Sequence, residues 1–260
     1  MKCESNNESA SLSRIYAWFS AVISEDIELL EDLLAHGVPI DAPHPLRHST
    51  ALMEATRLGR IATVLWLLER GAIPAFLCGL PQGTPLHCAI RRQHWAIARL
   101  LSDAMPSTAV LDAYGRTPLH LIALEGGIEG KSLGDAMALA ELLIEKGTPL
   151  DALDQDGTTA LHHCVINDLP ELAEILLKAG ATPNATIPDT GVSPLVIAAL
   201  ENNLTLAAML LKYKADPNQK TKEGLTPIRI LPSLERLAET MLDVMELSPH
   251  HHSAHPRTLN

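Results

Sequence analysis

Leucine-rich stretches recur along the chain, and each spaces its apolar residues for one face of a helix. Four of them close on a glycine, at the position where a helix C-terminus favours a left-handed residue: Gly37, Gly71, Gly147 and Gly180. Pro-containing segments such as "TPLDALD" and "ADPNQK" follow these turns and cannot continue a helix. The pattern therefore predicts helices separated by extended segments. No apolar run approaches the ~18 residues that a membrane span requires.

A second motif repeats in phase with the leucine-rich stretches. "TPLHCAI" begins at Thr84 and "TPLHLIA" begins at Thr117, 33 residues later. Weaker copies begin at Thr50, Thr159, Ser193 and Thr226, so that successive starts are 34, 33, 42, 34 and 33 residues apart. One period fits all five spacings if about nine extra residues lie between Thr117 and Thr159. The predicted unit is a turn, a short helix, a second turn, a longer helix and an extended finger.

This unit resembles the ankyrin repeat over residues 11–247. The resemblance implies an all-α solenoid of about seven helix-turn-helix units, namely five inner repeats and two divergent caps, with short β-hairpin-like fingers. Trp18 and Phe19 belong to the N-terminal cap, and residues 219–247 form the C-terminal cap. Residues 1–10 are expected to be a flexible segment, and residues 248–260 a disordered His-containing tail.

The histidines of the motif are assigned a structural role by the same resemblance. His87, His120 and His162 are expected to bind backbone groups and tie adjacent repeats together, while Thr84, Thr117 and Thr159 cap the first helices. Equivalent positions of stacked repeats do not converge on one point, so no metal site is expected. Cys88 and Cys164 are expected to be small buried apolar groups.

No catalytic constellation is predicted. A nucleophilic triad needs a rigid cleft, and the sequence offers no strand-turn-helix elbow, so the protein is predicted not to be an enzyme. The enzyme alternative would place its chemistry at His162, His163 and Cys164.

The stretch "EGGIEGKS", residues 125–132, is one residue away from a phosphate-binding loop, with Glu125 in place of the first glycine. It coincides with the nine-residue excess and lies between two predicted helices, whereas a phosphate loop must follow a strand. Residues 126–134 are therefore predicted to be an inserted loop at the binding edge, and Ser132 is predicted to be a helix N-cap. No nucleotide or other cofactor is expected.

Charge and cysteine content restrict the partners. The chain has 31 acidic and 20 basic residues and a formal charge of -11, which disfavours nonspecific nucleic-acid binding. The polar N-terminus lacks a signal peptide, and the four cysteines lack paired metal spacing, so reduced thiols and a cytoplasmic location are expected. No membrane or small-molecule substrate is expected, and the protein alone is expected to be monomeric.

The resemblance implies that another protein binds to the finger tips and to the exposed side of each first helix. The predicted partner-binding residues are Arg47, Arg57, Leu58, Arg91, Arg92, Tyr114, Arg116, Leu124, Glu125, Gln155, Asp156, Ile166, Asn167, Asp189, Leu200 and Glu201. Four further positions lie at finger tips, namely Leu46, Val192, Lys222 and Leu225.

The early positions of this set are basic and the later ones acidic, which predicts a bipolar groove. Because Arg forks onto carboxylates, we hypothesise that the basic half receives an acidic segment; the alternative is that these arginines are merely solvated. The predicted function is a non-enzymatic interaction module that acts as adaptor or inhibitor. Two cellular interpretations compete: a bacterial effector that captures a host protein in the host cytosol, and an immunity protein that neutralises a toxin.

Overall fold

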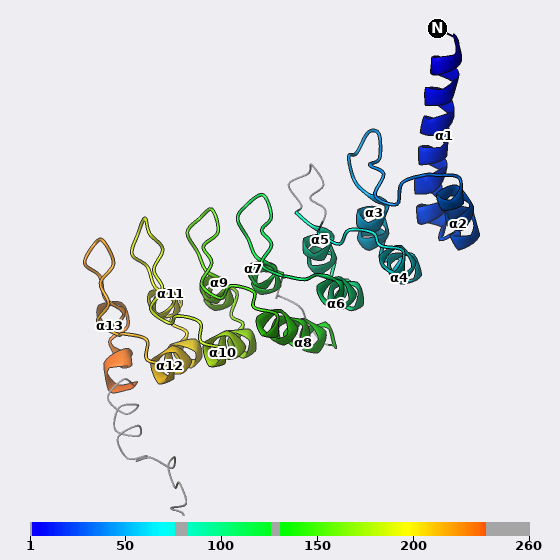
Figure 1. Cartoon of the computed structure of the whole chain (residues 1–260). Coiled ribbons are helices and arrows are strands. Elements are labelled where there is room, and N and C mark those ends of the chain that lie inside the picture. The colour runs from blue at the N-terminus through cyan, green and yellow to red at the C-terminus, as the bar shows by residue number, and fades with distance from the viewer. Residues whose placement is uncertain (1, 76–82, 126–130, 238–260) are drawn as a thin grey trace, which may run out of the picture. The chain divides into compact units, whose positions relative to one another are not determined.

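The computed structural model describes residues 2–75, 83–125 and 131–237. The chain divides into two compact units, Met1–Ala181 (unit 1) and Thr182–Asn260 (unit 2). The described residues form helices and turns without a strand (Figure 1), which confirms the predicted all-α repeat of about seven helix pairs. The helices are α1 (Lys2–Ser24), α2 (Ile27–Ala35), α3 (Ala51–Leu58), α4 (Ile61–Glu69), α5 (Pro85–Arg91), α6 (Trp95–Ala104), α7 (Pro118–Leu124), α8 (Lys131–Glu145), α9 (Ala160–Ile166), α10 (Pro170–Lys178), α11 (Pro194–Leu200), α12 (Leu204–Lys212) and α13 (Pro227–Ile230).

Each repeat begins with a capped short helix. The Thr50, Ser193 and Thr226 side chains accept hydrogen bonds from backbone N–H groups in the first turns of α3, α11 and α13. Helices α2, α4, α8 and α10 are each followed by a left-handed glycine, with φ of 88° at Gly71 and 78° at Gly147, whereas α6 and α12 are not. The helix boundaries thus follow from residues that satisfy the backbone groups at the helix ends.

The helices of unit 1 pack in chain order in two rows. The first helices α1, α3, α5, α7 and α9 contact one another in succession, and so do the second helices α4, α6, α8 and α10. The core between the rows is aliphatic, and Leu86, Leu119 and Leu161 in it are fully buried. In unit 2, α11 packs against both α12 and α13. None of the helices in the described part of the chain is long and apolar enough to cross a membrane.

The fingers of unit 1 extend from the first-helix row, on the side away from the second helices (Figure 1). Hydrogen bonds close the fingers at their bases: Asp112 N–H donates to Arg116 O at 3.0 Å, and Asp154 N–H donates to Thr158 O at 3.0 Å. Neighbouring fingers are also tied at their tips, where Gln155 N–H donates to Tyr114 O at 2.9 Å. The backbone therefore holds these two fingers at a fixed spacing.

The two ends of the repeat array differ from the prediction in their extent. Helix α1 starts at Lys2, so residues 2–10, predicted to be flexible, belong to a helix. Trp18 and Phe19 anchor this helix with 0% and 3% exposure, and a helix once nucleated extends readily into a polar segment. In the C-terminal cap, residues 233–237 are helical after α13; residues 238–247 of the predicted cap and the tail at 248–260 lie outside the described residues.

The predicted loop at 126–134 is corrected in its second half. Residues 126–130 lie outside the described residues, whereas Lys131–Gly134 form the first turn of α8. Helix α8 has 15 residues against nine in α4 and ten in α6, so part of the insert lengthens a helix. Ser132 consequently lies inside the helix and is not its N-cap.

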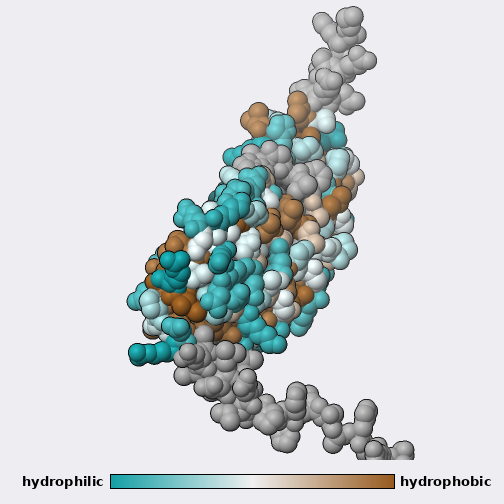
Figure 2. Space-filling view, turned by 90° about the vertical axis from the view of Figure 1, so that its left-hand side faces the viewer, coloured by the Kyte–Doolittle hydropathy of each residue, from teal (hydrophilic) through white to brown (hydrophobic). Residues whose placement is uncertain are grey.

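The surface is mainly polar with separate apolar areas. On the face shown in Figure 2, hydrophilic residues surround distinct hydrophobic patches. Several large apolar side chains are exposed on the fingers and at the ends of the first helices, including Tyr114 at 45% and Ile166 at 51%. Scattered exposed apolar residues are common, so only those that gather around a cleft or a charged cluster point to a binding surface.

Candidate functional site

Two motif histidines, His87 and His120, connect a first helix to the next finger. Thr117 N–H donates to His120 Nδ1 at 3.2 Å, and His120 Nε2 donates to Thr158 O at 3.1 Å. His87 repeats this arrangement, accepting from Thr84 N–H at 3.2 Å and donating to Arg116 O at 3.2 Å. Each ring thus accepts at one nitrogen and donates at the other, which requires the neutral form.

Burial favours the same neutral form. It lowers the pKa of His87 to about 4, and it also lowers the pKa of His120. These side chains have 0% exposure, so neither is placed to exchange protons with a substrate. The geometry gives them a structural role.

The motif copy that begins at Thr159 contains a buried polar network. Thr159 N–H donates to His162 Nδ1 at 3.2 Å, as in the other copies. The neighbouring His163 lies with Nε2 at 2.9 Å from Asp154 Oδ2 and 2.7 Å from Thr158 Oγ1. Burial raises the pKa of the Asp154 carboxyl, but the hydrogen bonds from His163 and Thr158 outweigh it and leave the pKa below its usual range.

The residues that the enzyme alternative would use are therefore engaged in structural contacts or buried. His162 caps a helix, His163 binds Asp154, and Cys164 is fully buried, with its pKa raised by desolvation. A thiol held neutral in an apolar environment is a poor nucleophile. Cys88 is likewise buried at 2% exposure beside Met53. No cluster of three or more His, Cys, Asp or Glu suited to a metal occurs among the described residues.

Two predicted arginines share a buried carboxylate on α3. Arg57 donates through Nε and one terminal nitrogen to Glu54 Oε2 at 3.0 and 2.8 Å, and Arg47 lies 3.5 Å from the same oxygen. Ser49 donates to the other Glu54 oxygen at 2.9 Å. Burial opposes the ionisation of Glu54, but these partners outweigh it and hold its pKa below the usual value. One positive charge in excess remains at this cluster.

A second cluster surrounds Asp112, whose side chain has 0% exposure. Its Oδ1 accepts the backbone N–H groups of Tyr114 and Arg116, and its Oδ2 accepts from the guanidinium groups of Arg116 and Arg91. Burial raises the Asp112 pKa, yet the N–H groups and the two cations lower it further than burial raises it. The Arg116 guanidinium also lies 4.3 Å from the Tyr114 ring centroid.

The other predicted residues of unit 1 lie around these two clusters. Arg92 is exposed and ends α5, while Gln155 donates to Ala113 O at 2.7 Å and Asn167 to Ala123 O at 3.0 Å. Leu58, Leu124 and Glu125 are half-buried, and Asp156 is exposed. We call the fingers and the exposed side of the first helices of unit 1 its finger-side surface.

Unit 2 has a cleft of about 500 Å³ between its two fingers and its first helices. It brings together five sequence-predicted positions, Asp189, Val192, Leu200, Lys222 and Leu225. Glu201 is exposed at the end of α11, next to Leu200, and does not line the cleft. The remaining lining residues are Thr190, Val196, Thr221, Glu223 and Ile230.

The sequence prediction missed the buried carboxylates Asp112, Asp154 and Glu54, which hold the neighbouring arginines and His163 in place. Asp112 and Asp154 each stand five residues before a motif threonine, and this repeated position was a signal that could have identified them. Glu54 gave no such signal, because the equivalent positions hold Cys88, Leu121 and His163.

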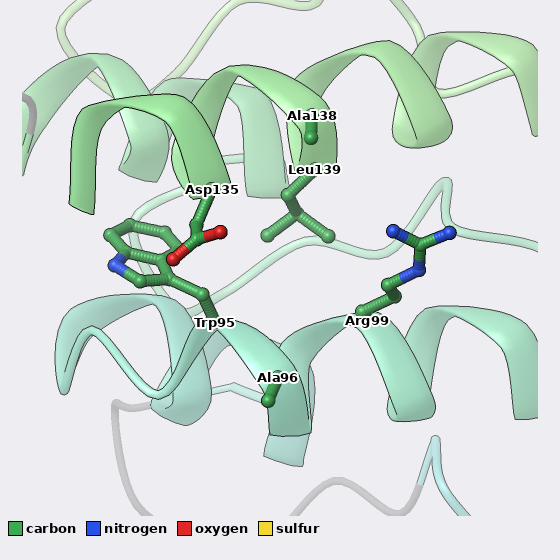
Figure 3. A pocket seen from close by; sticks show the side chains of 6 residues that line it. All are labelled: Trp95, Ala96, Arg99, Asp135, Ala138 and Leu139. Atoms are coloured by element: carbon green, nitrogen blue, oxygen red, sulfur yellow. The ribbon is translucent and has the colours of Figure 1, made fainter. Parts of the chain in front are cut away.

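A smaller cleft of about 230 Å³ lies in the second-helix row, between α6 and α8. Leu139 occupies its middle, Asp135 lies over the Trp95 ring, and Arg99 stands at the opposite end (Figure 3). Arg99 is exposed on α6, in the row opposite the fingers.

Comparisons with known proteins agree with the repeat geometry. A family model described as ankyrin repeats (three copies) matches residues 131–221. The B-cell lymphoma 3 protein homolog of Mus musculus is 32% identical over 141 residues, which is 54% of this chain and 30% of that protein. The chain thus spans less than a third of the length of this relative.

Two solved structures extend the agreement over most of the chain. The ankyrin repeat domain of Bcl-3 has a TM-score of 0.72 and 26% identity, covering 87% of this chain and 97% of that one. An ankyrin repeat domain from Acinetobacter baumannii has a TM-score of 0.67 and 27% identity, covering 77% of this chain and 99% of that one. The short helices capped in phase, and the histidines His87 and His120 that tie a repeat to the next finger, agree with these matches: the chain has the fold of ankyrin repeat domains, and residues 131–221 match the family model.

Proposed function

We propose that this chain is a non-enzymatic binding module that captures an acidic segment of a partner protein on the finger-side surface of unit 1, and so acts as adaptor or inhibitor. Ankyrin repeat domains typically bind other proteins and are usually non-catalytic. The partner and the choice between adaptor and inhibitor belong to the proposal.

The Asp112 cluster is the observation that carries this proposal. A buried carboxylate fixes Arg91 and Arg116, and Arg116 stacks on Tyr114, so these side chains have little rotamer freedom left to lose on binding. Two guanidinium groups against one carboxylate leave a net positive charge. Arg92 adds a further exposed charge at the end of the same helix as Arg91.

Exposed apolar side chains near the charges favour a protein as the occupant. Leu111 and Leu153 occupy equivalent finger positions with 51% and 47% exposure, and Ile166 at the end of α9 has 51%. Interfaces commonly combine Arg and Tyr anchors with apolar contacts of this kind.

The pairing of Arg91 decides which variant tests the proposal. Charge reversal at Arg91 would place a second carboxylate beside the buried Asp112 and perturb the fold as well as the surface. Arg92→Glu changes an exposed side chain instead, and Arg99→Glu is its matched control, because Arg99 is equally exposed but lies on the second-helix row.

The test is selection of a display library of random short peptides on the full chain and on both variants. Wild type and Arg99→Glu are expected to enrich Asp- and Glu-rich peptides, whose affinity for Arg92→Glu falls by about tenfold. Equal enrichment of such peptides on Arg92→Glu, or no acidic class on wild type, would overturn the proposal.

A further inference from the structure

We infer that the cleft of unit 2 is a second, separate docking site, which takes an aliphatic side chain of a partner protein from a segment that carries Lys or Arg beside it. The inference rests on the proposed function in that the occupant is a protein. It uses no residue of unit 1 and no acidic segment.

The cleft is lined by aliphatic side chains from two successive repeats. Val196 in its floor is 1% exposed, whereas Leu200 and Leu225 are 60% and 41% exposed. Val192 and Ile230 complete the apolar lining as half-buried residues. Its volume of about 500 Å³ is large enough to admit an aliphatic side chain.

The two threonine hydroxyl oxygens in the lining each accept a hydrogen bond from the backbone of their own finger. Thr190 Oγ1 accepts from Val192 N–H at 3.3 Å, and Thr221 Oγ1 accepts from Leu225 N–H at 3.2 Å. Their hydroxyl oxygens therefore serve the turns of their own fingers. An aliphatic side chain suits this lining better than a polar one, because a polar group would lose its water without full replacement.

The walls of the cleft are held in place by the backbone. Lys222 N–H donates to Thr190 O at 2.9 Å, which joins the two fingers. Gly191 has a φ of 72°, and a Cβ there would come within 3.0 Å of Lys222 N, so the fingers approach as closely as glycine allows. A cleft with fixed walls is open before any partner arrives, which lowers the cost of ordering on binding.

The charges at the rim set the character of the flanking residue. Asp189 and Glu223 contribute two carboxylates and Lys222 one ammonium group, all on exposed side chains. Glu201 follows Leu200 at the end of α11 and is also exposed. The carboxylates outnumber the ammonium group, so complementarity favours Lys or Arg next to the inserted side chain.

The test uses the same library of random short peptides on the full chain, with Leu200→Asp as the cleft variant. Leu204→Asp is the matched control, because Leu204 is 46% exposed at the start of α12 and does not line the cleft. Wild type and Leu204→Asp are expected to enrich peptides with Leu, Ile, Val or Met next to Lys or Arg. Leu200→Asp should bind these peptides about tenfold more weakly.

The double variant Asp189→Lys, Glu223→Lys tests the rim. It should keep the preference for an aliphatic residue but replace the basic neighbour by Asp or Glu. Enrichment of the aliphatic-basic class on Leu200→Asp, or its absence from wild type, would overturn the inference. The acidic class lost on Arg92→Glu reports on the proposed function, so the failure of one proposal is distinguishable from the failure of the other.

Discussion

His87 shows how one side chain ties two repeats together and makes their stability depend on pH. Its ring accepts from Thr84 N–H and donates to Arg116 O, and a second ring proton would meet the Thr84 N–H donor. Asp112 and Arg91 are the charged groups that act on this ring, with opposite effects on its pKa. Burial is the largest influence and acts with Arg91 against Asp112 to lower the His87 pKa, so the folded protein resists a protonation that the unfolded chain accepts.

We therefore predict that the protein loses stability as the pH falls from about 6.5 towards 4. The His87 pKa of about 4 lies below its unfolded value, so its contribution is complete above the unfolded pKa and declines below it. The free energy of unfolding should fall by roughly 2 kcal/mol between pH 7 and pH 5 on account of His87. His120 acts in the same direction.

Urea denaturation of wild type and His87→Asn at both pH values measures this effect. The variant should be less stable at pH 7 but should lose less stability on acidification, since the group that titrates is gone. If His87→Asn loses as much free energy of unfolding between pH 7 and pH 5 as wild type does, the assignment is contradicted.

At the scale of the element, one glycine lies within helix α8 and another follows it. Gly134 lies within the helix, and a Cβ there meets open space. Gly147 follows the same helix with a φ of 78° and also has open space around it. The two sites differ in backbone conformation and not in crowding.

We predict that Gly134→Ala raises the free energy of unfolding by ~0.5–1 kcal/mol, because alanine favours the helix and restricts the unfolded chain. Gly147→Ala is the counterpart and should lower it by ~1 kcal/mol, since an L-residue is strained in the left-handed region. Thermal or urea unfolding compares the two. A destabilised Gly134→Ala would show that this first turn of α8 is not helical.

The regular elements were predictable from sequence because they repeat. The motif threonines, the closing glycines and the 33-residue period together locate the short helices and the fingers. The insert was predictable in length only. Its glycines favour a loop, but packing of α8 against α6 and α10 carries Lys131–Gly134 into a helix.

The binding surface was predictable in position but not in its internal pairing. Arg91 and its partner Asp112 are 21 residues apart and lie on a helix and the following finger, so no local pattern joins them. Likewise, the cleft of unit 2 depends on Val196 and Ile230, which local sequence marks only as core residues. Contacts between repeats decide these features.

At the scale of the whole molecule, the tryptophans distinguish the two units. All three, Trp18, Trp66 and Trp95, lie in unit 1. Tryptophan fluorescence, excited selectively, therefore reports on unit 1, while circular dichroism reports on helices of both units. Repeat proteins gain stability mainly from nearest neighbours, so a local defect has its largest effect near its own repeat.

We predict that Leu206→Ala, at a fully buried site in α12, lowers the urea midpoint seen by circular dichroism more than the midpoint seen by fluorescence. Leu204→Ala, at an exposed site of the same helix, is the control and should change neither midpoint appreciably. Equal shifts of both midpoints in Leu206→Ala would mean that the chain unfolds as one cooperative body.

The bonds that join neighbouring finger tips also provide a reporter of binding. The amide protons of Gln155 and Lys222 are held by carbonyl groups of the preceding finger, at Tyr114 and Thr190. Either proton exchanges with deuterated solvent only when the two tips separate, so its exchange rate measures how often a pair of fingers parts. A partner that bridges the fingers of unit 1 slows exchange at Gln155. A partner that enters the cleft of unit 2 slows exchange at Lys222 instead. The exchange rates of these two amides thus tell which surface is occupied.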